Sequence, residues 1–214
     1  MKIIFEDNHL LVVEKPINMP VCEDDSKDLD LLTSLKKYLK EKYNKPGNVY
    51  LGLVHRLDRP VGGVMVFAKT SKAASRLSEQ VRTHKFKKEY NAIVIGKISN
   101  KGKFIDKLLK DNRTNIVSVN DLGKEAVLNY ELINYKDNYS FVKIDLETGR
   151  SHQIRVQFSY HGYPLYGDQK YNKDSKVGEQ ITLYATSLTF YHPITNELLT
   201  FKCDLPNKYP WNIF

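Results

Sequence analysis

Short apolar segments separated by charged loops dominate the chain, and most of them have the length of β-strands. Residues 3–16 read as short strands, in which the apolar run Leu10–Val13 is followed by the strand-ending Pro16. Gly62–Ala68 is apolar throughout, as expected of a buried strand. Further strands are predicted at residues 90–95, 182–190 and 198–205, and residues 193–196 form the hairpin loop between the last two.

The clearest alternation of apolar and polar positions lies within residues 123–146, which predict two strands. One face of the second strand carries Val142, Ile144 and Leu146, and the other carries Phe141, Lys143 and Asp145. The turn between the two strands is predicted at Lys136–Asn138. The pattern is that of a sheet with one buried face.

Three segments have the spacing of amphipathic helices: residues 29–43, residues 71–82 with Ser71 near the N-cap, and residues 150–161. Because strands outnumber helices and hairpin-length loops join many of them, we expect an α+β fold with a mixed, largely antiparallel sheet flanked by helices. No repeat or long linker forces a boundary, so residues 1–214 are expected to form a single domain.

Composition narrows the function only slightly. The chain has 33 Lys and Arg against 25 Asp and Glu, a net charge of +8 that suits a polyanionic partner without requiring one. Cys22 and Cys203 are isolated and are expected to be reduced thiols. No signal-peptide pattern and no apolar stretch of membrane-spanning length occurs, so we expect a cytoplasmic protein that does not enter the membrane.

The segment LVHRLDRPVGGVMVFAKT, residues 53–70, concentrates polar chemistry immediately before an apolar strand. Asp58 has Arg56 and Arg59 close by, and an opposite charge nearby lowers an Asp pKa by ~1–3 units. The glycines that follow permit a sharp turn or the close approach of a ligand. A structural ion pair in a loop is the alternative interpretation. A protein kinase is excluded, because the order of residues is H-R-L-D and the other kinase motifs are missing.

Two further segments carry candidate binding residues. LETGRSHQIRVQF, residues 146–158, places Arg150, His152, Gln153 and Arg155 near a predicted helix start, where they suit phosphate or carboxylate; a solvated helix end is the alternative. Residues 69–103 contain ten Lys and Arg against two acidic residues, with Phe86 and Tyr90 among them. Such a basic, aromatic stretch is typical of RNA binding, although core aromatics beside a solvated surface would look the same.

Together these segments resemble the RluA-type family of RNA pseudouridine synthases. HRLDRPVGGVMVFAKT is similar to the family's HRLD-x-x-x-x-G motif, FKKEYNAIV to its K-x-Y-x-A-x-V segment, and TGRSHQIRVQ to its TGR-x-HQIRVH block. VVEKPINMPV, PLYGDQKY and LYATSLTFYHPIT also fit the family. The resemblance runs from about Ile3 to Leu205. Two departures are Asn18, where the family usually has glycine, and Gln157, where it usually has histidine.

The resemblance implies a pseudouridine synthase fold with an active-site cleft across the sheet, and no small RNA-binding module before the catalytic domain. It implies that Asp58 is the catalytic residue, that Arg155 faces it and that Tyr90 packs against the uracil. Leu183 would be an apolar contact for the base, unless it is an ordinary core residue. Arg56, Arg59 and Arg150 would bind phosphates, and His152 and Gln153 would contact the substrate.

The implied reaction breaks the N1–C1′ bond of uridine and rejoins the base through C5, so neither a cofactor nor a metal is expected. The carboxylate could attack C1′ or remove the 2′ proton, and the sequence does not choose. We expect ribosomal or transfer RNA as the substrate, and a monomer. Two other functions were considered: an RNA-binding protein on the same fold without activity, and a metabolic enzyme that binds phosphate. A zinc deaminase is excluded because its ligand motifs are missing.

Overall fold

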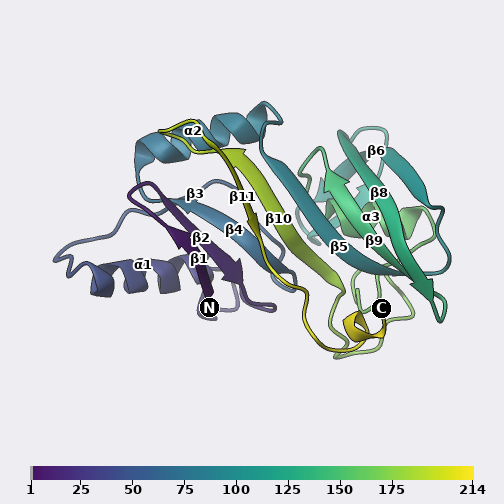
Figure 1. Cartoon of the computed structure of the whole chain (residues 1–214). Coiled ribbons are helices and arrows are strands. Elements are labelled where there is room, and N and C mark those ends of the chain that lie inside the picture. Colours follow the sequence, from purple (N-terminus) through teal and green to yellow (C-terminus); the bar gives the residue numbers. More distant parts are fainter. Residues whose placement is uncertain (1) are drawn as a thin grey trace. The chain divides into compact units, whose positions relative to one another are not determined.

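The computed structural model describes residues 2–214, which form two compact units, each with its own antiparallel strands (Figure 1). Unit 1 comprises residues 2–86 and 185–203, and unit 2 comprises residues 87–184 and 204–214. The expected α+β class is confirmed. The expectation that residues 1–214 act as one catalytic domain stays a prediction.

In unit 1 the strands follow the order β1-β2-β4-β10, with β3 beside β4 and β11 beside β10. Their bounds are β1 Lys2–Glu6, β2 Leu10–Lys15, β3 Gly52–Leu53, β4 Gly62–Ala68, β10 Leu183–Tyr191 (residues 185–191 in this unit) and β11 Leu198–Lys202. Alternate residues of β2 and β4 pack with Ala73 and Leu77 of helix α2 (Ser71–Arg82). Leu11 and Phe67 point to the opposite face and are also fully buried, so both faces of these strands are covered.

Both helices of unit 1 begin at a side-chain cap. Asp30 accepts a hydrogen bond from the Thr33 N–H at 2.9 Å and begins α1 (Leu31–Lys42), two residues later than predicted. Thr70, and not Ser71, caps α2 by accepting from the Ala73 N–H at 3.1 Å.

A nearly buried carboxylate, Glu6, joins β1 to α1 and to the end of β4. It accepts hydrogen bonds from Lys42 and Lys69 at 2.8 Å each and from the hydroxyls of Tyr43 and Tyr38. Burial by itself would raise the pKa of Glu6, but these four donors lower it to about 2. The carboxylate is therefore a charged structural link within unit 1.

In unit 2 the strands follow the order β5-β9-β8-β6-β7. Their bounds are β5 Lys87–Ile95, β6 Lys101–Asp111, β7 Ile116–Val119, β8 Lys124–Lys136 and β9 Tyr139–Leu146, and α3 (Gln153–Tyr160) and a short 3-10 helix (Trp211–Ile213) complete the unit. Asp137 and Asn138 both have positive φ and form the two-residue turn between β8 and β9, where the turn was predicted. The predicted burial of Val142, Ile144 and Leu146 is confirmed. Helix α3 packs on β6 and β7 (Figure 1).

Four elements of unit 2 differ from the prediction. Strands β6 and β7 were not predicted, because in β6 only Phe104 and Leu108 are buried and the lysines around them hide the alternation. Pairing with β8 on one side and β7 on the other makes β6 a strand. Helix α3 begins at Gln153 and not at residue 150, because His152 has a left-handed backbone with φ of 52°. Strand β5 begins at Lys87, three residues earlier than predicted.

Within residues 2–214, no helix combines the length and the apolar character needed to span a membrane. Cys22 and Cys203 are not joined in a disulfide, and Cys203 Sγ donates to the Ala185 carbonyl at 3.3 Å.

Candidate active site

Asp58 lies in the connection between β3 and β4 in unit 1, on a stretch of backbone that is anchored at both sides. Leu57 and Val61 are buried, and the Val61 N–H donates to the Asp58 carbonyl at 3.0 Å, which closes a tight turn. Asp58 itself is half-buried and Arg56 is exposed. The turn therefore presents a carboxylate from a fixed position at the start of β4.

A buried lysine that was not predicted as a site residue donates hydrogen bonds to the backbone of this turn. Lys15, at the end of β2, is 0% exposed, and its Nζ donates to the carbonyls of Pro16 at 2.9 Å, Arg59 at 3.0 Å and Val61 at 2.8 Å. Chiefly through burial, the pKa of Lys15 is lowered to about 7. The negative charge of Asp58 raises this pKa, and the positive charge of Arg59 also lowers it. Lys15 thus fixes the backbone on which Asp58 sits and interacts electrostatically with its carboxylate.

Two further contacts fasten the same segment to the sheet. His55 Nε2 accepts a hydrogen bond from the Val66 N–H at 3.1 Å, which ties the start of the HRLD motif to β4. Gly63 has φ of 125°, and a Cβ at this position would lie 2.2 Å from the carbonyl oxygen of Ala185 in β10. Gly63 is therefore needed for the close approach of neighbouring backbone, and the predicted approach of a ligand stays a prediction.

Arg59 turns away from the sheet toward the acidic loop that precedes α1. Its guanidinium is paired with Asp28 and Asp24, and its Nη1 donates to Ser26 Oγ at 2.8 Å. These carboxylates have pKa values below the usual range, for Asp28 chiefly because of Arg59 and for Asp24 chiefly because of Ser26. The phosphate contact predicted for Arg59 would have to compete with this loop.

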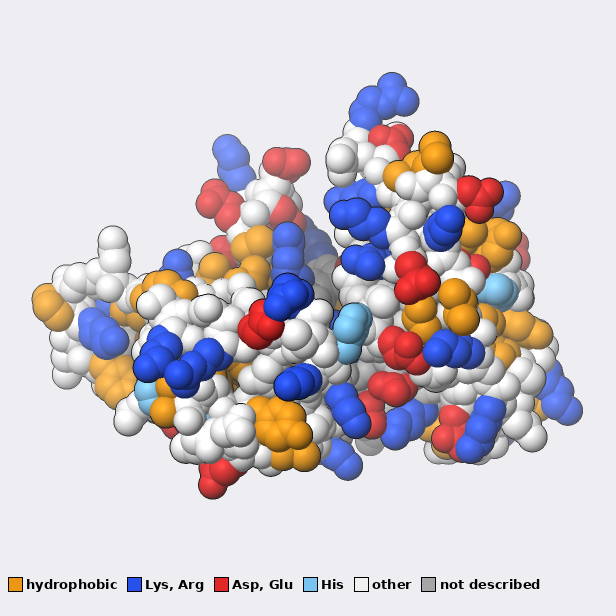
Figure 2. Space-filling view, turned by 90° about the horizontal axis from the view of Figure 1, so that it is seen from above, with side chains coloured by type: hydrophobic (Ala, Val, Ile, Leu, Met, Phe, Trp, Pro, Cys, Tyr) orange, Lys and Arg blue, Asp and Glu red, His pale blue; other side chains and the backbone are white. Residues whose placement is uncertain are grey.

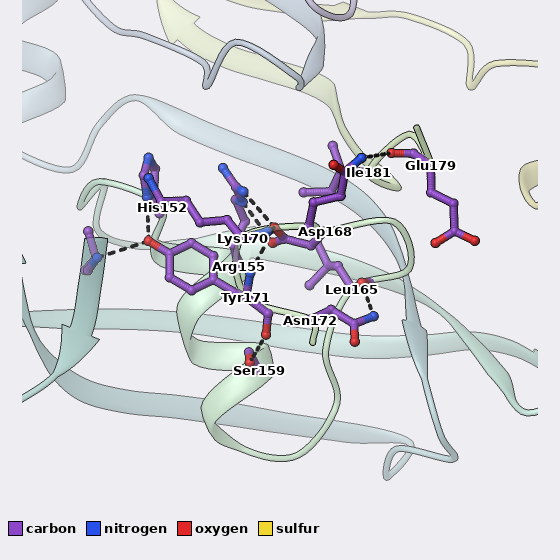
Figure 3. A network of polar contacts seen from close by, with 12 residues as sticks. His152, Arg155, Ser159, Leu165, Asp168, Lys170, Tyr171, Asn172, Glu179 and Ile181 are labelled. Carbon is purple, nitrogen blue, oxygen red and sulfur yellow. Dashed lines mark hydrogen bonds and ion pairs between the residues drawn. The ribbon is translucent and has the colours of Figure 1, made fainter. Parts of the chain in front are cut away.

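In unit 2, Arg155 of α3 forms a buried, bidentate ion pair with Asp168 (Figure 3). Its Nε donates to Asp168 Oδ2 at 2.9 Å and its Nη2 to Oδ1 at 2.7 Å, and the two side chains are 7% and 1% exposed. Asp168 also accepts from the N–H groups of Lys170 and Tyr171. Asp168 was not predicted as a partner of Arg155; the predicted contact with Asp58 stays a prediction.

Tyr171 connects this ion pair to the residue before α3. Its ring lies under the Arg155 guanidinium, with 5.2 Å between the guanidinium carbon and the ring centroid. Its hydroxyl accepts from the Val117 N–H at 3.0 Å and lies 2.6 Å from His152 Nδ1 (Figure 3). The strained backbone of His152 is therefore held by a side-chain contact.

Gln153 organises the loop that carries Arg150. Its Oε1 accepts from the Arg150 N–H at 3.0 Å and from Thr148 Oγ1 at 2.8 Å, and its Nε2 donates to Gln157 and to the Val127 carbonyl. Gln157, one of the departures from the family pattern, is fully buried and donates to Asp106 at 2.7 Å. The contacts of Gln153 fit a role in positioning the loop.

Tyr90 and Leu183 are both nearly buried, at 7% and 4% exposure. Tyr90 lies on β5 opposite Ile144 of β9. Leu183 follows Thr182, whose hydroxyl donates to the carbonyls of Ile93 and Tyr166 and fixes this part of unit 2. Unit 1 therefore brings together Asp58, Arg56 and Arg59. The other six predicted residues lie in unit 2.

The basic stretch of residues 69–103 is divided between α2 in unit 1 and β5 and β6 in unit 2. Several of its members are paired with carboxylates, among them Lys69 with Glu6, Lys101 with Glu131 and Lys103 with Glu147. Phe86 is buried and stacks on Phe190, so its interpretation as a core aromatic is the correct one. On the face shown in Figure 2, Lys and Arg side chains alternate with acidic and hydrophobic ones.

Comparison with known proteins decides the family. The profile described as RNA pseudouridylate synthase matches residues 9–160. The ribosomal large subunit pseudouridine synthase D of Zymomonas mobilis is 36% identical in an alignment 220 positions long, which covers 96% of this chain and 69% of the relative. The chain belongs to the RNA pseudouridylate synthase family. The uncharacterized RNA pseudouridine synthase YhcT of Bacillus subtilis is 33% identical, with 96% of this chain and 69% of the relative covered.

The solved structure of human RNA pseudouridylate synthase domain containing 4 has the same fold, with a TM-score of 0.81, 24% identity and coverage of 96% of this chain and 88% of that one. Two residues of the candidate site in the present chain, Lys15 and Asp168, were not predicted from the sequence. Lys15 could have been noticed as a charge that ends an apolar strand. Asp168 stands in a loop and carries no local signal of its pairing with Arg155.

Proposed function

We propose that this chain isomerises uridine to pseudouridine in the RNA of the large ribosomal subunit, with Asp58 as the catalytic carboxylate. The observation that carries the proposal is the Asp58 turn, which is fixed by two hydrogen bonds from the fully buried Lys15, to the carbonyls of Arg59 and Val61. A preorganised charged group is what this chemistry requires. We infer the RNA of the large ribosomal subunit as the substrate from relatives such as the ribosomal large subunit pseudouridine synthase D of Zymomonas mobilis.

The proposed reaction needs one ionised carboxylate beside the sugar. Asp58 either attacks C1′ as the N1–C1′ bond breaks and is displaced when C5 attacks C1′, or removes the 2′ proton and returns it when C5 adds to C1′. In both routes C5 loses its proton and N1 gains one. Lys15 assists by holding the turn and by placing a positive charge near the Asp58 carboxylate. Atoms and charge balance without an external reagent, because the product is an isomer of the substrate.

Residues of unit 2 receive the base in this proposal. Tyr90 packs against the uracil, and Leu183 adds an apolar contact. Arg155, whose Nε and Nη2 both donate to Asp168, is the residue that we propose to face the Asp58 carboxylate. Asp168 and the ring of Tyr171 then set the orientation of this guanidinium.

The reaction requires the uridine to leave the stack of neighbouring bases, because an enzyme cannot reach the reacting atoms of a base inside a helix. Arg56 and Arg150 are exposed and bind neighbouring phosphates, with His152 and Gln153 ordering the loop beside them. Arg59 joins them once an RNA phosphate displaces the carboxylates of Asp24 and Asp28. We propose a cytoplasmic location, where such RNA is modified.

The test is tritium release from RNA labelled at uridine C5, prepared from a strain that lacks the gene and separated into large-subunit, small-subunit and transfer RNA. Wild-type protein should release tritium from large-subunit RNA, and Asp58→Asn should release none while binding the same RNA. Asp25→Asn, which removes an exposed carboxylate next to Asp24 in the loop that Arg59 contacts, is the matched control and should act like wild type.

Release from transfer RNA alone would refute the proposed substrate and leave the reaction standing. Normal release by Asp58→Asn would refute the role of Asp58. Salt-dependent RNA binding by wild type with no release from any fraction would favour the alternative, an inactive RNA-binding protein on the same fold.

A further inference from the structure

Lys88 lies on β5 in unit 2, at the level where β9 ends. Glu89 pairs with Asp145 and Tyr90 with Ile144, so the next position back on β5 stands opposite the end of β9 at Leu146. Residues two apart on a strand point to the same face, so Lys88 shares its face with Tyr90. The chain beyond β9 continues into the loop Glu147–Arg150.

The ammonium group of Lys88 reaches this loop. A Cβ built on Gly149 would lie 3.0 Å from Lys88 Nζ, so the charge sits against the main chain of Gly149. Burial lowers the pKa of Lys88. Within residues 2–214 its ammonium has no hydrogen-bond or ion-pair partner, although a desolvated ammonium is costly without one.

Neighbouring lysines of unit 2 have carboxylate partners. Lys143 of β9 lies 3.2 Å from Glu89, and Lys103 of β6 lies 3.0 Å from Glu147. Both are surface pairs of the kind that decorate a solvated sheet. Lys88 differs from them in being half-buried and in having no carboxylate partner, so its charge is left for an anionic ligand to neutralise.

The loop beneath Lys88 is rigid and open to solvent. Thr148 and Arg150 are both tied to Gln153 Oε1, at 2.8 and 3.0 Å. Gly149 and Arg150 are exposed, and Arg150 Nε donates to the Glu125 carbonyl at 2.8 Å. An anion at Gly149 would therefore contact a preformed main chain. The ammonium of Lys88 and the guanidinium of Arg150 would supply two positive charges beside it.

We propose that Lys88, Gly149 and Arg150 form a binding site for one RNA phosphate, adjacent to the nucleotide whose base packs on Tyr90. The site rests on the proposed function, because it assumes an RNA substrate. Glycine at position 149 leaves room for the ammonium and the phosphate oxygen to meet. Lys88 is a substrate-binding residue in this proposal and takes no part in bond breaking.

The experiment measures binding of a large-subunit ribosomal RNA transcript across a range of salt concentrations, in the inactive Asp58→Asn background. Lys88→Met should weaken binding on the order of tenfold at moderate salt. It should reduce the slope of log affinity against log salt by ~0.7–0.9, the value for one phosphate contact. Lys88→Arg, which keeps the charge, should retain the slope.

Lys87→Met is the matched control, because Lys87 is the exposed neighbour on the other face of β5 and interacts electrostatically with Asp145. Gly149→Ala, which needs only a small shift of the ammonium, tests the same site without removing a charge and should weaken binding in the same direction. Thermal melting of each variant separates a folding defect from a binding defect.

Equal slopes for Lys88→Met and Lys87→Met would overturn the proposal. So would a fall in turnover in the Asp58-containing enzyme with affinity and slope unchanged, which would place Lys88 at the reacting base. If wild type released no tritium but Lys88→Met still reduced the slope, the proposed reaction would fail and the phosphate site would stand. Absence of salt-dependent RNA binding by wild type would overturn both.

Discussion

The buried pair of Arg155 and Asp168 allows a quantitative prediction about unit 2. The two side chains are 7% and 1% exposed and share two hydrogen bonds of 2.9 and 2.7 Å. Removing one partner leaves the other charge buried and uncompensated, which costs ~3–5 kcal/mol. We expect Arg155→Met and Asp168→Asn each to lower the free energy of unfolding by about this amount, and the melting temperature by roughly 10 °C for a chain of this size.

The variant that carries both Arg155→Met and Asp168→Asn should lose less free energy of unfolding than the two single losses added together, because neither charge is then left buried without its partner. A coupling energy of about 2 kcal/mol or more is expected from a double-mutant cycle in urea. The exposed pair of Lys101 and Glu131, 75% and 53% exposed, is the control in the same unit. Lys101→Met and Glu131→Gln should couple by less than ~1 kcal/mol.

A coupling energy near zero for Arg155 and Asp168 would refute the reasoning, since it would mean that Arg155 is stabilised mainly by other groups. The same variants also test the proposed chemistry. If Asp168 sets the orientation of the guanidinium, Asp168→Asn should lower tritium release although it touches no substrate. Unchanged release by Asp168→Asn in a folded protein would separate the ion pair from catalysis.

Three further predictions concern unit 1. Lys15→Met should lower turnover about a hundredfold with RNA affinity kept, because the Asp58 turn loses its support. Between pH 7 and 10.5 the unfolded state holds the Lys15 proton and the folded state does not, so the folded protein becomes more stable as the pH rises. In urea titrations over this range, the free energy of unfolding of wild type should therefore increase by up to about 5 kcal/mol relative to that of Lys15→Met. A constant difference between the two proteins would contradict the lowered pKa. Glu6, with its pKa of about 2 against 4.5 when unfolded, stabilises the fold above pH 4.5; acid titration toward pH 2 should remove about 3 kcal/mol from wild type and less from Glu6→Gln. Gly63→Ala should cost more than about 3 kcal/mol in thermal or urea unfolding, and Gly47→Ala, with nothing within 4 Å of the new Cβ, almost nothing.

Local pattern was sufficient for much of the fold. The strand at Gly62–Ala68 was predicted with its observed bounds, and the alternation of residues 141–146 predicted which side chains are buried. These elements have one strong periodicity and definite ends, so their local preferences agree with their tertiary surroundings. β6 was missed because its two buried side chains stand four residues apart among lysines, and its hydrogen-bond partners are distant in sequence.

The sequence by itself determined the family and the candidate residues, because the chemistry of the site is carried by short motifs whose residue types can be read in order. Only the tertiary structure decided the partners of those residues. Lys15 reaches carbonyls 44 and 46 residues away, and Arg59 reaches Asp28 and Asp24 more than 30 residues before it. Arg155 finds Asp168 across a loop. A charge reveals its sign in the sequence, but its partner depends on which segments the fold brings within a few ångströms, and Coulomb and hydrogen-bond energies depend on that distance and on burial.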